Sequence, residues 1–161
     1  MIRQYQDGDR EQCRALWREL TEHHRIIYDD PRIGGEHPED YFDKQLKKVG
    51  PENLWVAEDE EVIGLTGLEP RQEGFAIEPL IVSKPHRGKG IGRALVERML
   101  AEARERGAKF LSMEPVARNV ETIAFMHRMG FTQLGQVELL VFFGDLKWRP
   151  GFEMHGLEFE Y

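Results

Sequence analysis

A basic, glycine-rich loop occupies residues 85–95, with the sequence PHRGKGIGRAL, directly before a run of apolar residues. Glycines let a backbone approach a bound anion closely and take up positive φ angles. The first turn of a helix adds N–H groups without partners and the positive end of the helix dipole. The charges of Arg87, Lys89 and Arg93 strengthen the same potential. The loop therefore predicts a site for a phosphate or a pyrophosphate.

Two common phosphate-binding patterns do not fit this loop. A Walker loop requires Lys followed by Ser or Thr after a longer loop, and that pair is absent. The dinucleotide fingerprint requires a glycine where this chain has Arg93, and it follows the first strand of a parallel unit. Here the loop follows three consecutive predicted strands. The ligand must therefore be held by another kind of phosphate site.

A second segment, NVETIAFMHRMGF at residues 119–131, strengthens the signal. Residues 87–92 fit the R/Q-x-x-G-x-G/A signature of the GNAT superfamily of N-acetyltransferases, and they lie, as in that family, between a strand ending in LIV and a long helix. The second segment resembles the family's N-x-x-A-x-x-x-Y-x-K-x-G-F pattern. The residues that match or nearly match are Asn119, Arg128, Gly130 and Phe131. The resemblance covers residues 54–137 firmly and the remainder in layout only.

The resemblance implies acetyl-CoA, a form of coenzyme A, as the cofactor. The backbone of Leu80, Ile81 and Val82 would pair with the pantetheine arm like an added strand. Asn119 would lie near the pantetheine or cap the following helix. The pyrophosphate would be held by the loop, that is, by Arg87, Gly88, Lys89, Gly90, Ile91, Gly92 and Arg93.

Acetyl transfer to an amine requires a base, because a free alkylammonium group titrates near pH 10.4. A carboxylate can take that proton directly or through water. Glu78 lies on the cofactor strand, where the family often keeps such a base, and Glu114 on the neighbouring strand is the second candidate. Either residue could instead be a strand carboxylate paired with a nearby arginine.

The residue expected to protonate the leaving thiolate is missing. The family usually has a tyrosine beside the cofactor four residues before Gly130, and this chain has Met126 there, whose thioether donates no proton. His127 is adjacent but points about 100° further round the helix. The thiolate could leave without a dedicated acid, or His127 or a tyrosine from elsewhere could substitute. In a third interpretation the domain is a catalytically silent acyl-CoA-binding regulatory module.

The resemblance favours an enzyme: an N-acetyltransferase that moves the acetyl group to a primary amine of a small molecule or peptide by direct attack with general-base help. The acceptor site would be built from the first two helices, their loop and the late strands. Tyr28, Asp29 and Asp30 could meet a cationic acceptor there, or form a solvated turn. His23, His24 and the two aspartates match no compact metal motif, so no metal site is predicted.

The composition of the chain restricts which binding partners and which cellular compartment we expect. The formal net charge of −7 argues against a nucleic-acid partner. The longest apolar run, LLVFF at residues 139–143, is too short to cross a bilayer. A single cysteine, Cys13, excludes an internal disulfide, and the N-terminus lacks the apolar core of a signal peptide. We expect a cytoplasmic protein without a membrane partner. Family members often dimerise through late strands, so residues 152–161 are a candidate homodimer contact.

The length of the chain predicts one domain over residues 1–161, and the order of the expected helices and strands predicts an α/β (α+β) layout. The fold class that the resemblance implies is the acyl-CoA N-acyltransferase fold. It has a central mixed, mostly antiparallel sheet of six or seven strands, flanked by about four helices and splayed between strands four and five. Pro79 should disrupt its strand near Glu78, since proline cannot donate to a sheet ladder. Helices are expected over 10–24, 39–48, 90–106 and 120–129, and strands in MIRQY, LWVAE, EVIGLTGLEP, FAIEPLIV, KFLSMEP, FTQLGQVELLVFF and FEMHGLEFEY.

Overall fold

The computed structural model describes residues 1–161, and its elements follow the predicted order as far as the helix at Val120–Arg128. Three short 3-10 helices, η1 (Asp7–Asp9), η2 (Pro51–Asn53) and η3 (Lys84–His86), join some of them. The longer elements are β1 (Ile2–Gln4), α1 (Arg10–Tyr28), α2 (Asp40–Val49), β2 (Leu54–Asp59), β3 (Glu61–Pro70), β4 (Gly74–Val82), α3 (Ile91–Glu105), β5 (Phe110–Ser112), α4 (Val120–Arg128), β6 (Pro150–Met154) and β7 (Leu157–Glu160). No helix combines the length and the apolar character that a membrane span requires.

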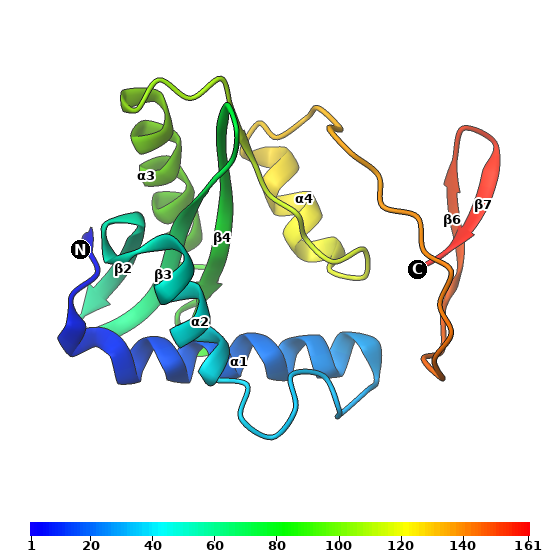
Figure 1. Ribbon diagram of the computed structural model, residues 1–161, viewed down its shortest axis with the longest axis horizontal. Helices are drawn as coiled ribbons and strands as arrows, with labels where there is room; N and C mark the ends of the chain where they lie inside the picture. The colour runs from blue at the N-terminus through cyan, green and yellow to red at the C-terminus, as the bar shows by residue number, and fades with distance from the viewer.

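The central sheet has five strands in the order β1-β2-β3-β4-β5. All its neighbouring pairs are antiparallel except β4 and β5, which are parallel. Helices α1 and α2 cover one face of the sheet, and α3 and α4 cover the other (Figure 1). The predicted mixed, mostly antiparallel sheet with four helices is therefore confirmed.

Apolar side chains fill the space on both faces of the sheet. On the α1–α2 face the core includes Cys13, which is fully buried, as its place in the apolar stripe of the first helix predicts. On the α3–α4 face the core joins Trp55, Leu68, Ile77, Val96, Met99 and Met126. A third cluster of Ala57, Ile63 and Leu95 lies under the start of α3. Packing on both faces holds β3 and β4 rigidly, and these two strands carry the site described below.

Strands β4 and β5 separate after a short parallel contact. They pair only from Gly74 opposite Phe110 to Ala76 opposite Ser112. There β5 ends, while β4 continues to Val82 with β3 as its only neighbour. The predicted splay between strands four and five is thus present, and it leaves one edge of β4 without a partner strand.

The predicted disruption near Pro79 is also confirmed. Leu68 pairs with Ile77 and Thr66 pairs with Leu80, so two residues of β4 lie opposite the single residue Gly67. This is a β-bulge, which bends a strand and redirects its side chains. It lies at the point where the edge of β4 has lost β5, so the open edge and the bulge occur together.

The late strands differ from the prediction. Residues 131–143, FTQLGQVELLVFF, form no strand, although their composition favours one. Strands β6 and β7 pair only with each other, as a separate hairpin. The central sheet therefore has five strands rather than six or seven. The physical reason is that a strand needs a paired backbone, and no other strand of this chain lies beside residues 131–143.

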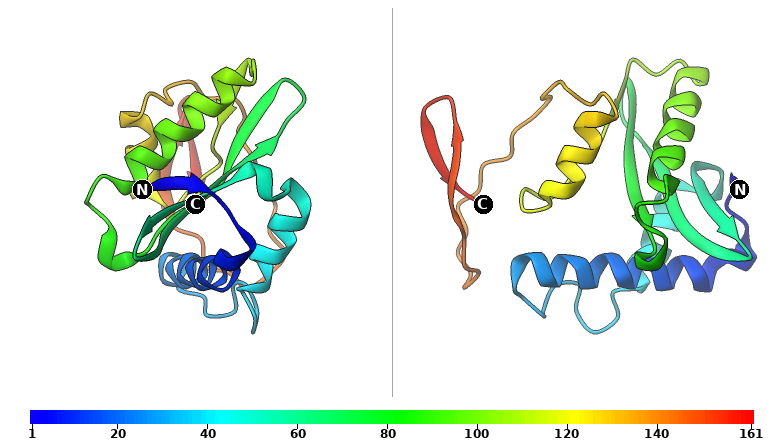
Figure 2. Two further views of the ribbon diagram at one scale, coloured as in Figure 1. Left: turned by 90° about the vertical axis from the view of Figure 1, so that its left-hand side faces the viewer. Right: turned by 180° about the vertical axis from the view of Figure 1, so that it is seen from behind.

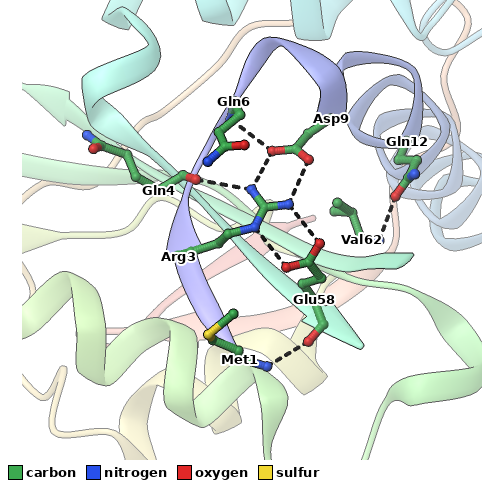
Figure 3. Close-up of polar contacts among 8 residues, drawn as sticks. All are labelled: Met1, Arg3, Gln4, Gln6, Asp9, Gln12, Glu58 and Val62. Atoms are coloured by element: carbon green, nitrogen blue, oxygen red, sulfur yellow. Dashed lines mark hydrogen bonds and ion pairs between the residues drawn. The ribbon is translucent and has the colours of Figure 1, made fainter. Parts of the chain in front are cut away.

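Arg3 ties the first strand to the rest of the sheet (Figure 3). Its Nε and Nη2 donate to the carboxylate of Glu58 at 2.8 and 2.9 Å, and its Nη1 and Nη2 donate to that of Asp9 at 2.7 and 2.8 Å. Such bidentate pairs are among the stronger polar contacts in proteins. The hydrogen bond from Arg3, with burial opposing it, lowers the pKa of Asp9. One guanidinium thereby joins β1, β2 and the start of α1.

Replacing Arg3 with Met should lower the free energy of unfolding by about 1–3 kcal/mol, because it leaves the buried carboxylate of Asp9 without a cation. Urea denaturation at neutral pH measures the change. Lys109→Met is the control, because the ion pair of Lys109 with Glu73 is exposed on both sides and should contribute at most about 1 kcal/mol.

The contribution of Asp9 should also depend on pH. The pKa of Asp9 is lower in the folded chain than its ordinary value of 3.8. The stabilisation of the fold by ionised Asp9 is therefore fully present above pH 3.8, and it is lost as the pH falls through the lower pKa of the folded chain. The stability difference between wild type and Arg3→Met should shrink in the same window. Equal stabilities of the two variants at neutral pH would mean that the Arg3 contacts contribute nothing.

Candidate functional site

The glycine-rich loop presents a series of free amides at the start of α3. Gly88 and Gly90 have φ angles of 75° and 85°, in the left-handed region that favours glycine. None of the N–H groups of residues 88–93 donates a hydrogen bond within the chain, and no side chain caps the helix. Six consecutive donors at the positive end of a helix dipole suit an anion with several oxygens.

Space is available in front of these amides. A Cβ atom added at Gly88 or Gly90 would meet nothing within 4 Å, so the loop faces open volume. Lys89 and Arg93 are exposed beside it. Arg87 turns back towards the sheet, where its Nε donates to the carbonyl of Val82 at 2.9 Å. The loop is therefore anchored to the end of β4 while its amides and two cations remain available.

The open edge of β4 leads towards this loop. The N–H of Ser83 donates to the carbonyl of Ile63 at 2.9 Å, so Ser83 faces β3. Backbone groups alternate along an antiparallel pair, so Ile81 also faces β3, while Leu80 and Val82 face the open edge. The bond from Arg87 to the carbonyl of Val82 agrees with this assignment. Of the three residues expected to bind pantetheine, Leu80 and Val82 have their backbone groups directed away from β3.

These features fit the group that the fold implies. A diphosphate can be held by amides that have no other acceptor, and an extended amide-bearing chain can pair with a strand edge that has no neighbour. The two sites are contiguous, because η3 alone separates the end of β4 from the loop. The donor set of this chain therefore matches a pyrophosphate attached to a pantetheine arm.

The bulge places Glu78 beside the open edge and fixes its backbone. A Cβ atom at Gly67 would come within 2.7 Å of the carbonyl oxygen of Glu78, so only glycine fits opposite the bulge. Gln45, buried on α2, donates its Nε2 to the same carbonyl at 3.2 Å. The position of Glu78 is thus set by β3 on one side and α2 on the other.

Glu78 differs electrostatically from the other carboxylates near it. Burial is the main reason why its pKa is raised above the ordinary 4.5, and the negative charge of Glu69 adds to the rise. Lys48 and Arg71 act in the opposite direction. The carboxylate of Glu78 makes no hydrogen bond or ion pair within the chain. A half-buried, unpaired carboxylate with a raised pKa is a stronger proton acceptor than an exposed one.

The neighbouring carboxylates already have cationic partners. Glu69 accepts from Lys48 at 2.8 Å and from Arg71. Burial alone would raise the pKa of Glu69, but the hydrogen bonds from Lys48, Arg71 and Gln45 outweigh it and lower the pKa. Glu114 is exposed and pairs with Arg71 at 3.3 Å. The arginine pairing that was the alternative for both candidate bases therefore applies to Glu114 and not to Glu78.

Three predicted residues lie on α4 or at its start. Asn119 caps the helix, since its side-chain oxygen accepts from the N–H of Thr122 at 3.2 Å. Met126 is 4% exposed and packs in the core with Val96 and Met99, so it contributes packing to this face of the sheet. His127 is exposed, on a different side of the helix. Neither Met126 nor His127 contacts Glu78 through a hydrogen bond or an ion pair.

The three predicted acceptor residues lie together at the end of α1, in a pocket of about 420 Å³. The ring of Tyr28 lies 4.6 Å from the guanidinium carbon of Arg118. Asp29 ends the helix with a φ of 52°. A side-chain hydrogen bond from Arg32 lowers the pKa of Asp30 to about 2. These residues make no hydrogen bond or ion pair with Glu78.

The sequence of the described region matches a known family. The family model described as "Acetyltransferase (GNAT) family" matches residues 14–131. The chain belongs to the GNAT acetyltransferase family. The match includes the glycine-rich loop and residues 119–131, and it extends from α1 to Phe131, where the irregular segment begins. The fold, the splayed sheet and the free amides of the GNAT loop agree with this membership.

Curated acetyltransferases match part of this chain. N-acetyltransferase 8B of Rattus norvegicus is 33% identical over 103 residues, which is 60% of this chain and 44% of the relative. Streptothricin acetyltransferase of Streptomyces lavendulae is 46% identical over 61 residues, 38% of this chain and 32% of the relative. The alignments therefore span less than half the length of these relatives.

A solved structure agrees with the fold along most of the chain. The ribosomal-protein-alanine N-acetyltransferase from Brucella melitensis has a TM-score of 0.67 and 25% identity. The similarity covers 84% of this chain and 86% of the Brucella chain. The GNAT fold thus extends beyond residues 87–92 and 119–131, the two segments whose sequences resemble the family.

Sequence reasoning missed the residues that surround Glu78. Gln45, Lys48, Glu69 and Arg71 come from α2, β3 and the turn after β3, so nothing in their spacing connects them to Glu78. The cross-strand register could have indicated that Glu69 lies near Glu78, because Glu69 is opposite Ala76 on β4. Once β3 and β4 are aligned, Glu69 falls next to the predicted bulge. The contacts from α2 could not be anticipated, because helix placement on a sheet is not encoded in local spacing.

Proposed function

We propose that this chain is an acetyl-CoA-dependent N-acetyltransferase that acetylates a primary amine of a small molecule or a peptide. One observation carries the proposal: six amides without acceptors lie beside an open strand edge, and that edge ends at an unpaired, half-buried carboxylate. The free amides and the open strand edge suit the binding of acetyl-CoA. The unpaired carboxylate suits a proton transfer next to the bound cofactor.

Acetyl-CoA, when bound, supplies an acetyl group activated as a thioester. The amides of residues 88–93, with Lys89 and Arg93, would hold the pyrophosphate. The backbone groups of Leu80 and Val82 would bind the pantetheine. Asn119 supports the site indirectly, by capping α4.

Glu78 would accept the proton that the acceptor ammonium must lose before the amine can attack. Burial makes Glu78 a stronger base, while Lys48 and Arg71 limit the rise of its pKa and favour the ionised form. We assign no proton donor for the leaving thiol to this chain, because Met126 carries no acidic proton and His127 is exposed. Of the three carboxylates Glu69, Glu78 and Glu114, only Glu78 has no cationic partner, and its negative charge suits a cationic acceptor.

The names of the relatives support the acceptor class. One is named for streptothricin, a small molecule, and another for the alanine of a ribosomal protein. Both kinds of acceptor present an amine. The acceptor of this chain is therefore proposed to be a primary amine, either on a small molecule or on a peptide.

Release of the CoA thiol from acetyl-CoA, followed with a thiol reagent, tests the function. The assay compares a panel of small primary amines and short peptides with a control lacking any amine. We expect release that depends on at least one amine, together with a mass increase of one acetyl group on that amine. Tight binding of acetyl-CoA without release by any member of the panel would favour the silent regulatory module instead.

The charges around Glu78 should set the acid side of the pH–rate profile. Activity requires ionised Glu78, so the rate should rise as the pH passes upward through its pKa. Glu69→Gln removes a charge that raises this pKa and should move the rise to lower pH. Lys48→Met removes a charge that lowers it and should move the rise to higher pH.

The control for this pair is Glu73→Gln, an exposed carboxylate whose partner is Lys109. Its profile of kcat/KM against pH should overlay that of the wild type. Shifts of Glu69→Gln and Lys48→Met in the same direction would show that the profile does not report the ionisation of Glu78.

A further inference from the structure

Lys48, at the end of α2, lies on the same face of the sheet as Glu78. Helix α2 lies with α1 on the face opposite α3, as the left view of Figure 2 shows. Glu69 is directly opposite Ala76, so their side chains share a face, and Glu78 follows two residues further along β4. Lys48 pairs with Glu69 at 2.8 Å. A lysine and the candidate base therefore share the face that α2 covers.

Polar contacts connect Lys48 to Glu78 in two steps. Oε2 of Glu69 accepts from Nζ of Lys48 at 2.8 Å and from Nε2 of Gln45 at 3.5 Å. The same Nε2 donates to the carbonyl of Glu78 at 3.2 Å. Glu69 is buried and Gln45 is buried, so both are held in place. The ammonium group of Lys48 is thus positioned next to the bulge that carries Glu78.

The charge of Lys48 acts on the carboxylate of Glu78. It lowers the pKa of Glu78, whereas burial, which is the main effect, raises it. Lys48 is the one lysine among the charges that shift this pKa. An influence of one charge on another across a protein surface requires proximity, because salt screens distant charges. The electrostatics therefore agree with the contacts in placing this amine beside the candidate base.

Lys48 also has the chemistry of the proposed acceptor, because its side chain ends in a primary amine on a flexible stem. The side chain is 59% exposed, so it has room to leave the ion pair. Glu69 keeps Arg71 and Gln45 as hydrogen-bond donors when the ammonium leaves. An ion pair with one exposed partner is weak, so this movement is not costly.

We propose that, without another acceptor, this chain acetylates its own Lys48, an inference that rests on the proposed function. Nζ of Lys48 forms a bond with the acetyl carbonyl carbon, and the bond from that carbon to the CoA sulfur breaks. The ammonium group gives up two protons on becoming an amide. One proton ends on the sulfur of the free thiol, and Glu78 passes the other to water. The products are CoA and Nε-acetyllysine at position 48.

The modification would regulate the same site, since an acetylated lysine carries no charge. Glu78 would lose a charge that lowers its pKa, and Arg71 would remain as the only cation opposing the rise. Burial and the charges of Glu69 and Glu114 would still act to raise it. The pKa of Glu78 should therefore increase. The acid side of the pH–rate profile of the acetylated chain should move to higher pH than that of the unmodified chain.

Mass spectrometry of the chain incubated with acetyl-CoA and no amine tests the proposal. We expect a gain of one acetyl group, which peptide mapping locates at Lys48, at a rate per chain that stays constant when the protein is diluted. Lys48→Arg keeps a cation at this position and should not be modified there. Lys47→Arg, at the neighbouring exposed lysine, is the matched control and should still acquire the group. Glu78→Gln should slow the modification by about 100-fold.

Uncatalysed acetylation would give a different pattern. It would modify Lys47 as fast as Lys48, and Glu78→Gln would not slow it. Either result, or a rate per chain that rises with protein concentration, would overturn the proposal.

A second measurement uses the chain without acetyl-CoA. The ¹³C signal of the Glu78 carboxylate should titrate at higher pH in Lys48→Gln, an uncharged mimic of acetyllysine, and at the wild-type pH in Lys47→Gln. Equal titrations in all three chains would overturn the regulatory effect. Release of the CoA thiol with added amines is read separately. Turnover of an added amine without modification of Lys48 would refute self-acetylation and leave the proposed function intact, whereas absence of both would refute the two together.

Discussion

Gly90→Glu should weaken acetyl-CoA binding by about 100-fold or more. A Cβ atom at Gly90 meets nothing within 4 Å, so the new side chain can extend into the volume that the free amides face. Its carboxylate would enter the site proposed for the diphosphate, and two unit charges about 5 Å apart repel by roughly 3 kcal/mol near a protein surface. Each 1.4 kcal/mol corresponds to about tenfold in affinity. Titration calorimetry with acetyl-CoA measures the loss.

The control for this variant separates charge from backbone strain. Gly90→Gln has the same shape and the same left-handed backbone requirement, which costs a non-glycine residue about 1–2 kcal/mol in either variant. It lacks the charge, so its affinity should fall by no more than about tenfold. Both variants should give a far-UV circular dichroism spectrum like that of the wild type. Equal acetyl-CoA affinities of Gly90→Glu and Gly90→Gln would show that the diphosphate does not bind at this loop.

Glu78→Gln should reduce kcat/KM at neutral pH by roughly 100-fold to 1,000-fold, since a positioned general base contributes an effect of that order. The glutamine keeps the size of the side chain and does not disturb the carbonyl that Gln45 binds, so the affinity for acetyl-CoA should remain within about twofold. The rise of activity on the acid side should also disappear, because the group that titrates there is gone.

Glu114→Gln is the comparison that makes this result specific. Glu114 was the second candidate from the sequence, but it is exposed and paired with Arg71. Its replacement should change kcat/KM by less than about threefold. The opposite pattern, with activity lost in Glu114→Gln and kept in Glu78→Gln, would identify Glu114 as the general base.

Much of this fold could be predicted because its signals are local. The glycine-rich loop, the proline in β4 and the apolar stripe of α1 each depend on neighbours within a few residues, and the structure confirms the elements that they predict. The same holds for the cap of α4 by Asn119. Element boundaries moved by a few residues, as for α1, which continues to Tyr28 instead of ending near His24.

The remaining features depend on long-range contacts. The choice between Glu78 and Glu114 could not be made from the sequence, which predicts both residues on strands. In the structure β5 ends at Ser112, before Glu114, and Arg71 pairs with Glu114 but not with Glu78. The strand predicted at residues 131–143 is absent for a similar reason, because strand formation also depends on long-range contacts. Its composition favours a strand, but a strand also needs a partner backbone.

Amide chemical shifts in the presence of CoA test the central claim most directly. With the backbone N–H signals of the ¹⁵N-labelled chain assigned, CoA should be added in steps to saturation. The account predicts that the largest downfield shifts occur at residues 88–93, with further changes at Leu80 and Val82. If those amides keep their positions while others move, or if no signal moves, the loop does not bind the diphosphate and the proposed function loses its support.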